Sequence, residues 1–192
     1  MNMKVKLPLI FLLVIITTQL TSCVAAIVVG AAASYIVYDK RGLLTMESDG
    51  RIFYLIHRAI VTNPRFNDSR IVVTCFNGMV LLIGQTPNAE LKILTEKIAY
   101  NTQNVKRVYD QISIGRPISL TERGKDSLIT SQLRSLMLAH KGLESGSIRI
   151  VTENGNVYLM GIVTKSQAKM AVNIVRKIAG VHKVIKIFRY IV

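Results

Sequence analysis

The chain has 192 residues and a net charge of +14, because 25 Lys and Arg residues outnumber 11 Asp and Glu residues. This excess of positive charge favours nucleic acid or an anionic membrane as the partner. The two cysteines, Cys23 and Cys75, form no CxxC motif and no Cys/His spacing of a zinc site, so the sequence excludes a structural metal of that kind.

The amino terminus has the layout of a secretory signal. Lys4 and Lys6 precede an apolar run, Leu7 to Ile16, and small and polar residues lead on to Leu20-Thr21-Ser22-Cys23. These last four residues resemble a bacterial lipobox, in which the cysteine is acylated and becomes the new amino terminus. We expect residues 1–22 to be a signal peptide and Cys23 to be the lipidation site, carrying N-acyl diacylglycerol and needing no other cofactor.

An uncleaved membrane anchor is the alternative, because Leu7 to Tyr38 together are long enough to cross a bilayer, although polar residues interrupt the stretch. Val24 follows the cysteine, whereas Asp at that position resembles an inner-membrane retention signal. The expected localisation is therefore the outer membrane of a Gram-negative cell, lipid-anchored on the periplasmic face. Cleavage would remove two lysines and leave a charge of 14 − 2 = +12. Cys75 would then have no disulfide partner in the chain and is expected to be a small buried side chain.

Residues 23–48 are expected to be the lipidated N-terminus and a spacer, and two similar modules follow. Each module opens with an aspartate and apolar residues at i, i+4 and i+8 spacing, which predicts a helix with one buried stripe. The aspartate before each stripe predicts an N-cap. The matching residues, 77 positions apart, are Asp49, Ile52, Ile56 and Ile60 in the first module and Asp126, Ile129, Leu133 and Met137 in the second.

An Asn-Gly pair follows in both modules, at Asn77-Gly78 and Asn154-Gly155. This pair tolerates the positive φ angles of a two-residue type I′ turn, so each copy predicts a β-hairpin. The upstream hairpin arms are residues 71–75 and 148–152. The downstream strands end at Gly84 and Gly161, where a side chain is expected to collide with a neighbouring element.

A second helix and a final strand complete each module. The helices have one apolar face, and the strands cover residues 108–114 and 184–191. The order helix, strand, strand, helix, strand predicts an α+β fold with modules at 49–114 and 126–192 and a linker at 115–125. The apolar faces consist of Leu91, Leu94 and Ile98 in the first module and Ala168, Ala171 and Val175 in the second.

This αββαβ order, the repeated Asn-Gly-x-Val-x-Leu-x-Gly core and the trailing Gly180-Val181-x-x-Val184 resemble the BON domain. Two copies behind a lipobox are similar to the dual-BON outer-membrane lipoproteins, and the resemblance covers essentially the whole chain. It implies two tandem BON domains, each with a three-stranded mixed sheet and two helices on one face. It further implies binding of anionic phospholipid through the second domain, a role in outer-membrane integrity and concentration at division sites.

In the family, the lipid contact lies on the first helix of the second domain. Residues 126–192 carry a net +7, against +3 for residues 49–112, so the second module is the basic one. Leu128 occupies the position of a typical family Trp and Gln132 that of a Lys, whereas Arg134 matches the family as a headgroup contact. Alternatively, Leu128 packs against the other module or the linker. The expected phospholipid-binding residues are Leu128, Ser131, Gln132, Arg134 and Ser135.

Catalytic chemistry is not indicated. The three histidines, His57, His140 and His182, are scattered, and the sequence has no carboxylate pair, nucleophile with a base, or phosphate loop. We therefore expect a non-enzymatic protein with no small-molecule substrate and no bound metal. A second hypothesis is a protein-interaction module for an outer-membrane assembly machine, a division protein or another envelope complex. Nucleic acid is not an expected partner if the signal sequence is functional.

Overall fold

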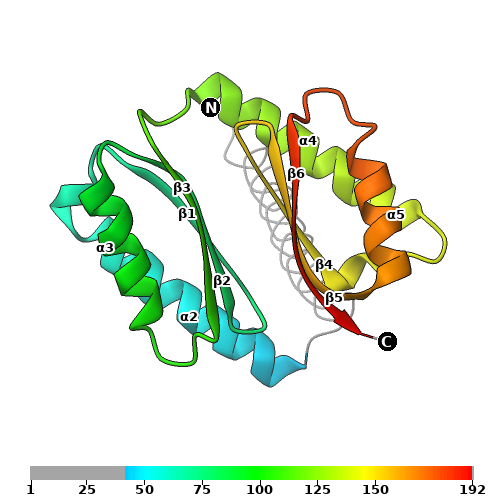
Figure 1. Ribbon diagram of the computed structural model, residues 1–192, viewed down its shortest axis with the longest axis horizontal. Helices are drawn as coiled ribbons and strands as arrows, with labels where there is room; N and C mark the ends of the chain where they lie inside the picture. Colours follow the sequence, from blue (N-terminus) through cyan, green and yellow to red (C-terminus); the bar gives the residue numbers. More distant parts are fainter. Residues whose placement is uncertain (1–41, 192) are drawn as a thin grey trace, which may run out of the picture. The chain divides into compact units, whose positions relative to one another are not determined.

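The computed structural model describes residues 42–191, so the expectations for Cys23, the signal peptide and most of the spacer lie outside the described residues. The predicted order of helix, strand, strand, helix, strand is confirmed and occurs twice (Figure 1). The first copy consists of α2 (Leu43–Val61), η1 (Pro64–Phe66), β1 (Arg70–Phe76), β2 (Met79–Thr86), α3 (Ala89–Tyr100) and β3 (Arg107–Ile114). The second consists of α4 (Leu120–Ala139), η2 (Ser145–Ser147), β4 (Ile148–Glu153), β5 (Asn156–Thr164), α5 (Lys165–Val175) and β6 (Lys183–Ile191).

Each copy forms a three-stranded mixed sheet, as predicted. The strand orders are β1-β2-β3 and β4-β5-β6. In each sheet the hairpin strands pair antiparallel, and the central strand pairs in parallel with the last strand. Figure 1 shows that α2 and α3 lie on one face of the first sheet, and that α4 and α5 lie on one face of the second. The parallel pair requires a crossover, which α3 and α5 supply.

The predicted hairpin turns are confirmed by their backbone angles. Asn77 and Gly78 have φ values of +52° and +75°, and Asn154 and Gly155 have +52° and +68°. Positive φ at both central residues is the requirement of a type I′ turn, whose twist matches that of the flanking strands. The Asn-Gly pairs therefore fix where each hairpin reverses.

The two strand glycines are required by close approach of the neighbouring backbone. A Cβ atom at Gly84 would lie 1.9 Å from the carbonyl oxygen of Arg70, and at Gly161 it would lie 2.4 Å from that of Ser147. Gly84 also has a φ of +125°, which side-chain-bearing residues rarely adopt. The expected collision at both positions is confirmed, whereas the expected strand ends are wrong, because β2 continues to Thr86 and β5 to Thr164.

The predicted buried stripes form the helix-facing cores. Ile52, Ile56 and Ile60 of α2 are buried in the first copy. Along β2, Val80 and Leu82 belong to this core, whereas the residues between them face the other way. That opposite face is also covered, because it shares a third apolar cluster with the second sheet. The third cluster contains Phe76, Met79, Leu81 and Ile83 from the first copy and Tyr158, Met160 and Ile187 from the second.

The predicted N-cap role of the two aspartates is wrong. Helix α4 begins at Leu120, after a Ser119 N-cap, so Asp126 lies in the helix interior. Helix α2 likewise begins before Asp49, after Gly42. Residues 120–125, expected to be linker, are the first turns of α4. Ser119 and Glu122 form the capping box that starts this helix.

Candidate functional site

The two interior aspartates fasten the first helix of each copy to its hairpin turn. Asp126 is 6% exposed, and its carboxylate accepts hydrogen bonds from the backbone N–H groups of Asn154 at 2.7 Å and Gly155 at 2.8 Å. Asp49 accepts the same two bonds, at the same distances, from the Asn-Gly turn of the first copy. The turn N–H groups need an acceptor because they are removed from the sheet ladder. The carboxylates therefore fix the rotation of α2 and α4 about their axes.

Cys75 is buried in β1, as predicted for a small apolar side chain. Its thiol also donates to the Asp49 carboxylate at 3.2 Å, a contact that the sequence did not indicate. The equivalent residue in the second copy is Thr152, whose hydroxyl pairs with Thr130 instead. Cys75 therefore adds a third donor to the helix-to-hairpin fastening of the first copy.

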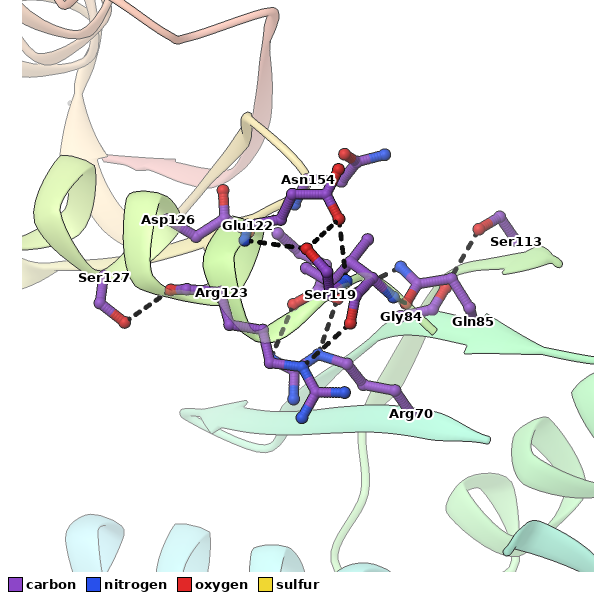
Figure 2. A network of polar contacts seen from close by, with 12 residues as sticks. Arg70, Gly84, Gln85, Ser113, Ser119, Glu122, Arg123, Asp126, Ser127 and Asn154 are labelled. Carbon is purple, nitrogen blue, oxygen red and sulfur yellow. Dashed lines mark hydrogen bonds and ion pairs between the residues drawn. The ribbon is translucent and has the colours of Figure 1, made fainter. Parts of the chain in front are cut away.

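The start of α4 is held by a local polar network (Figure 2). Glu122 accepts hydrogen bonds from the Ser119 backbone N–H, and this contact is the main reason that the pKa of the exposed Glu122 carboxyl is lowered. The Ile118 carbonyl accepts from Nε of Arg123 at 3.2 Å, and the Ile118 N–H donates to the Gln85 side chain of β2 at 3.2 Å. The network joins the beginning of α4 to the first sheet.

Glu153 is a second link between the copies. Its buried carboxylate accepts from Nε of Arg70 at 3.0 Å, from Nη2 of Arg70 at 3.1 Å and from Gln85 at 3.2 Å. Burial, and secondarily the charge of Glu153, raises the pKa of Tyr158 in the adjacent apolar cluster. A bidentate arginine contact fixes geometry as well as charge, so Arg70 and Glu153 set the register between the two sheets.

All five residues expected to bind phospholipid are exposed on α4. Leu128, Ser131 and Ser135 follow one another at i, i+3 and i+7 on the side of the helix opposite the buried stripe. Gln132 and Arg134 flank this line on either side. Leu128 is 72% exposed, so packing against the other copy or the linker does not account for it.

The sequence-based prediction missed Leu138 on the same line. Leu138 is 63% exposed and continues the spacing of Leu128, Ser131 and Ser135 at i+10. The signal was available in the sequence, because a leucine ten residues after an exposed leucine lies on the same helix face. The outward line of α4 therefore has leucine at both ends and serine between them.

The two serines of this line have small side chains, and one is already hydrogen-bonded within the helix. The Ser135 hydroxyl donates to the Ser131 carbonyl at 3.2 Å, and Ser127 makes the corresponding bond to Arg123 at 2.9 Å. A hydroxyl whose proton is satisfied locally costs less to move into a less polar environment. Ser135 can therefore approach an apolar phase without leaving its hydroxyl proton unpaired.

Within residues 42–191 no group of three or more His, Cys, Asp or Glu side chains could hold a metal ion. The histidines remain apart: the His57 ring stacks on Phe53, whereas His140 and His182 contact backbone carbonyl oxygens. In the same part of the chain no helix has both the length and the apolar character needed to span a bilayer.

Comparison with known proteins bears on the fold and the family. The outer membrane lipoprotein DolP of Haemophilus influenzae is 35% identical over 177 residues, covering 91% of this chain and 92% of the relative. The 21 kDa hemolysin of Actinobacillus pleuropneumoniae is 35% identical over 124 residues, 65% of this chain and 64% of that protein. A solved structure of CdsD, a structural protein of the type III secretion system of Chlamydia trachomatis, matches at 14% identity with a TM-score of 0.32. The match covers 72% of this chain and 91% of the CdsD chain.

The family model of the BON domain matches two separate parts of the chain, residues 48–116 and 125–191. Each match contains one complete αββαβ copy except for the first turns of its opening helix. The alignment with DolP covers 91% of this chain, and the two BON-domain matches together cover most of the same sequence. The chain therefore belongs to the BON-domain family, as a dual-BON protein of the DolP type.

Proposed function

We propose that this chain is a non-enzymatic, periplasm-facing outer-membrane lipoprotein that binds anionic phospholipid through its second BON domain and supports envelope integrity. The name of the Haemophilus relative and the lipobox-like segment ending at Cys23 support the membrane anchor. The observation that carries the lipid site is the outward line of α4, which contains the 72%-exposed Leu128 and is flanked by the exposed Arg134. Concentration at division sites is part of the same proposal and rests on the family resemblance alone.

The energetics suit a tethered domain. Burying most of one leucine side chain in a lipid interface contributes about 1.5 to 2 kcal/mol. One basic side chain near an anionic leaflet adds about 1 kcal/mol. The sum, about 3 kcal/mol, corresponds to a dissociation constant of several millimolar, which is too weak to hold a free protein at a membrane but is measurable by NMR at millimolar lipid. A lipid anchor holds the domain at millimolar effective concentration, so contacts of this strength are sufficient.

Charge and packing support a lipid contact on the second domain. Residues 126–192 carry ten Lys and Arg against three Asp and Glu, a net +7. The Asp126 fastening turns Ile129 and Leu133 inward, which leaves Leu128 and its line outward. The basic domain therefore presents a fixed, partly apolar helix face, as interfacial contact requires.

The lipid site is tested by NMR titration of residues 42–192 with phosphatidylglycerol micelles. Leu128→Asp and Arg134→Glu should each abolish the lipid-induced chemical-shift changes on α4. The rest of the spectrum should remain that of a folded protein. Ile93→Asp is the matched control, because Ile93 is 63% exposed on α3 of the first domain and should leave the titration unchanged. Shifts that persist in the two α4 variants would show that the site is elsewhere.

The anchor is tested separately by labelling cells with radioactive palmitate. We expect label on the wild-type chain and none on Cys23→Ser. A stoichiometric protein captured by crosslinking, combined with no response to phosphatidylglycerol, would favour the protein-interaction hypothesis over lipid binding.

A further inference from the structure

Helix α2 of the first domain has an exposed face with a composition different from that of α4. Its buried stripe fixes the opposite side of the helix as the outward side, just as in α4. Along that outward side, Arg51, Tyr54, Arg58 and Val61 follow one another at i, i+3, i+7 and i+10, and all four are exposed. The Tyr54 ring lies in the middle, with an arginine one turn away in each direction.

The comparison with α4 is position by position, since the copies are offset by 77 residues. Arg51 corresponds to Leu128, and Tyr54 corresponds to Ser131. Arg58 corresponds to Ser135. The aromatic ring and the paired cations that α4 lacks on its outward line are therefore present on α2.

The neighbouring side chains extend the same surface. Phe53 and His57, both exposed, stack with ring centroids 5.3 Å apart and an interplanar angle of 24°. Leu55 is exposed on the other side of the line. Stacking restricts the rotamers of both rings, so less side-chain entropy remains to be lost on contact.

The charges on this face identify the kind of partner. Within residues 42–191 neither Arg51 nor Arg58 forms an ion pair with a carboxylate. Glu47 is the one acidic residue on the outward line, so the line carries a net positive charge. A guanidinium binds phosphate through two parallel hydrogen bonds, and a tyrosine suits the boundary between headgroups and acyl chains. Phosphate next to an apolar phase is the chemistry of an anionic lipid surface.

Helix α2 follows closely after the expected lipidation site in the sequence, so a lipid anchor would keep it near the membrane. Leu43, its first residue, is 43 − 23 = 20 residues from Cys23. Even when fully extended, 20 residues span no more than about 70 Å. If Cys23 is acylated, as the proposed function holds, α2 stays within a few nanometres of the leaflet, at about millimolar effective lipid concentration.

We propose that the outward face of α2 is a second docking surface for anionic phospholipid membrane, in which Tyr54 occupies the headgroup boundary and Arg51 and Arg58 bind lipid phosphates. This inference rests on the proposed lipid anchor and extends membrane contact to the first domain. It does not require Leu128 or any other residue of α4.

The chain contains no tryptophan, so a single introduced tryptophan reports on its own surroundings. The test uses the full lipidated chain in phosphatidylglycerol or phosphatidylcholine vesicles containing acyl-chain-brominated lipid. Tyr54→Trp should show a blue shift and a loss of fluorescence in phosphatidylglycerol but not in phosphatidylcholine. Ile93→Trp, on the exposed face of α3, should show neither. Reversing both arginines, Arg51→Glu with Arg58→Glu, should restore the fluorescence of Trp at position 54.

Tyr54→Trp fluorescence that matches the Ile93→Trp control in phosphatidylglycerol would overturn the inference. Shielding from aqueous iodide without quenching by brominated lipid would overturn it too, and would indicate contact with protein. Leu128→Trp separates this inference from the proposed function. Quenching at position 128 alone refutes the α2 surface and leaves the α4 site standing. Quenching at position 54 alone refutes the α4 site and supports the α2 surface. Quenching at neither position refutes lipid binding by both helices.

Discussion

Replacement of Asp126 by alanine tests whether the carboxylate fastens α4 to the second hairpin. The side chain is 6% exposed and accepts two backbone hydrogen bonds, at 2.7 Å and 2.8 Å. Alanine removes both acceptors and introduces no new steric contact. The N–H of Gly155, which is buried, is left without a partner, whereas the N–H of Asn154 is only partly buried and can reach water.

The expected loss of stability follows from those two bonds. A hydrogen bond to a charged group contributes about 1.5 to 3 kcal/mol. We assign about 3 kcal/mol to the buried Gly155 bond and about 1.5 kcal/mol to the Asn154 bond. Alanine in a helix interior regains about 0.5 kcal/mol relative to aspartate. The net loss is therefore about 4 kcal/mol in the free energy of unfolding, or about 10 °C in the melting temperature for a chain of this size.

Urea unfolding followed by far-ultraviolet circular dichroism measures this loss. Amide exchange at Gly155 should accelerate in the same variant, because its N–H is no longer bonded. Asp49→Ala should lose a similar amount in the first domain, since the hydrogen-bond distances are the same. Asp68→Ala, at an exposed aspartate, is the control and should stay within about 0.5 kcal/mol of wild type. A loss below about 1 kcal/mol for Asp126→Ala would refute the fastening role.

Gly161→Ala should destabilise the second domain by about 2 kcal/mol or more, because the added Cβ would collide with the Ser147 carbonyl oxygen. Gly124→Ala, in open space on α4, should stabilise the domain by about 0.5 to 1 kcal/mol, and thermal unfolding compares the two variants. Glu153→Ala should lower the free energy of unfolding by about 3 kcal/mol, because it leaves the partly buried guanidinium of Arg70 unpaired. An unchanged midpoint of urea unfolding would contradict this. The lowered pKa of Glu122 means that its stabilisation of the α4 N-terminus is present above pH 4.5 and is lost as pH falls through the depressed folded value. Amide protection factors at the start of α4 should therefore fall in acid, and Glu122→Gln should remove that dependence.

Much of each domain could be predicted because the signals are local. Asn77-Gly78 predicts its turn through a positive-φ requirement confined to two residues. The stripe of Ile129, Leu133 and Met137 repeats with the helical period, so burial of one face follows from spacing alone. The repetition of both signals at a fixed offset indicated two copies of one fold.

The prediction failed where a residue acts over a long distance in the chain. A short stretch of sequence does not distinguish an aspartate at a helix N-cap from an aspartate inside the helix. The carboxylate of Asp126 reaches N–H groups 28 and 29 residues away, and that partner can be identified only after the hairpin has folded against the helix. The capping box of Ser119 and Glu122 was the local signal that α4 starts earlier.

The exposed faces of the helices were predicted in part. Leu128 was expected to lie outward because its neighbours fill the buried stripe, and the structure places it there. The aromatic and basic face around Tyr54 was not recognised, because an exposed tyrosine between arginines has no period that separates it from an ordinary solvated surface. Exposure depends on what covers the helix, and only the packed structure shows that.

The sequence alone determined the fold of each domain, since turns, helical stripes and strand glycines are set by backbone angles and short spacings. The tertiary structure decided how these parts are joined. Arg70 and Glu153 are 83 residues apart, and nothing in either segment indicates that they meet. Likewise, the second face of β2 is buried only because the two sheets share one apolar cluster. Contacts of this kind depend on the placement of whole elements, and that placement is decided only when the chain has packed.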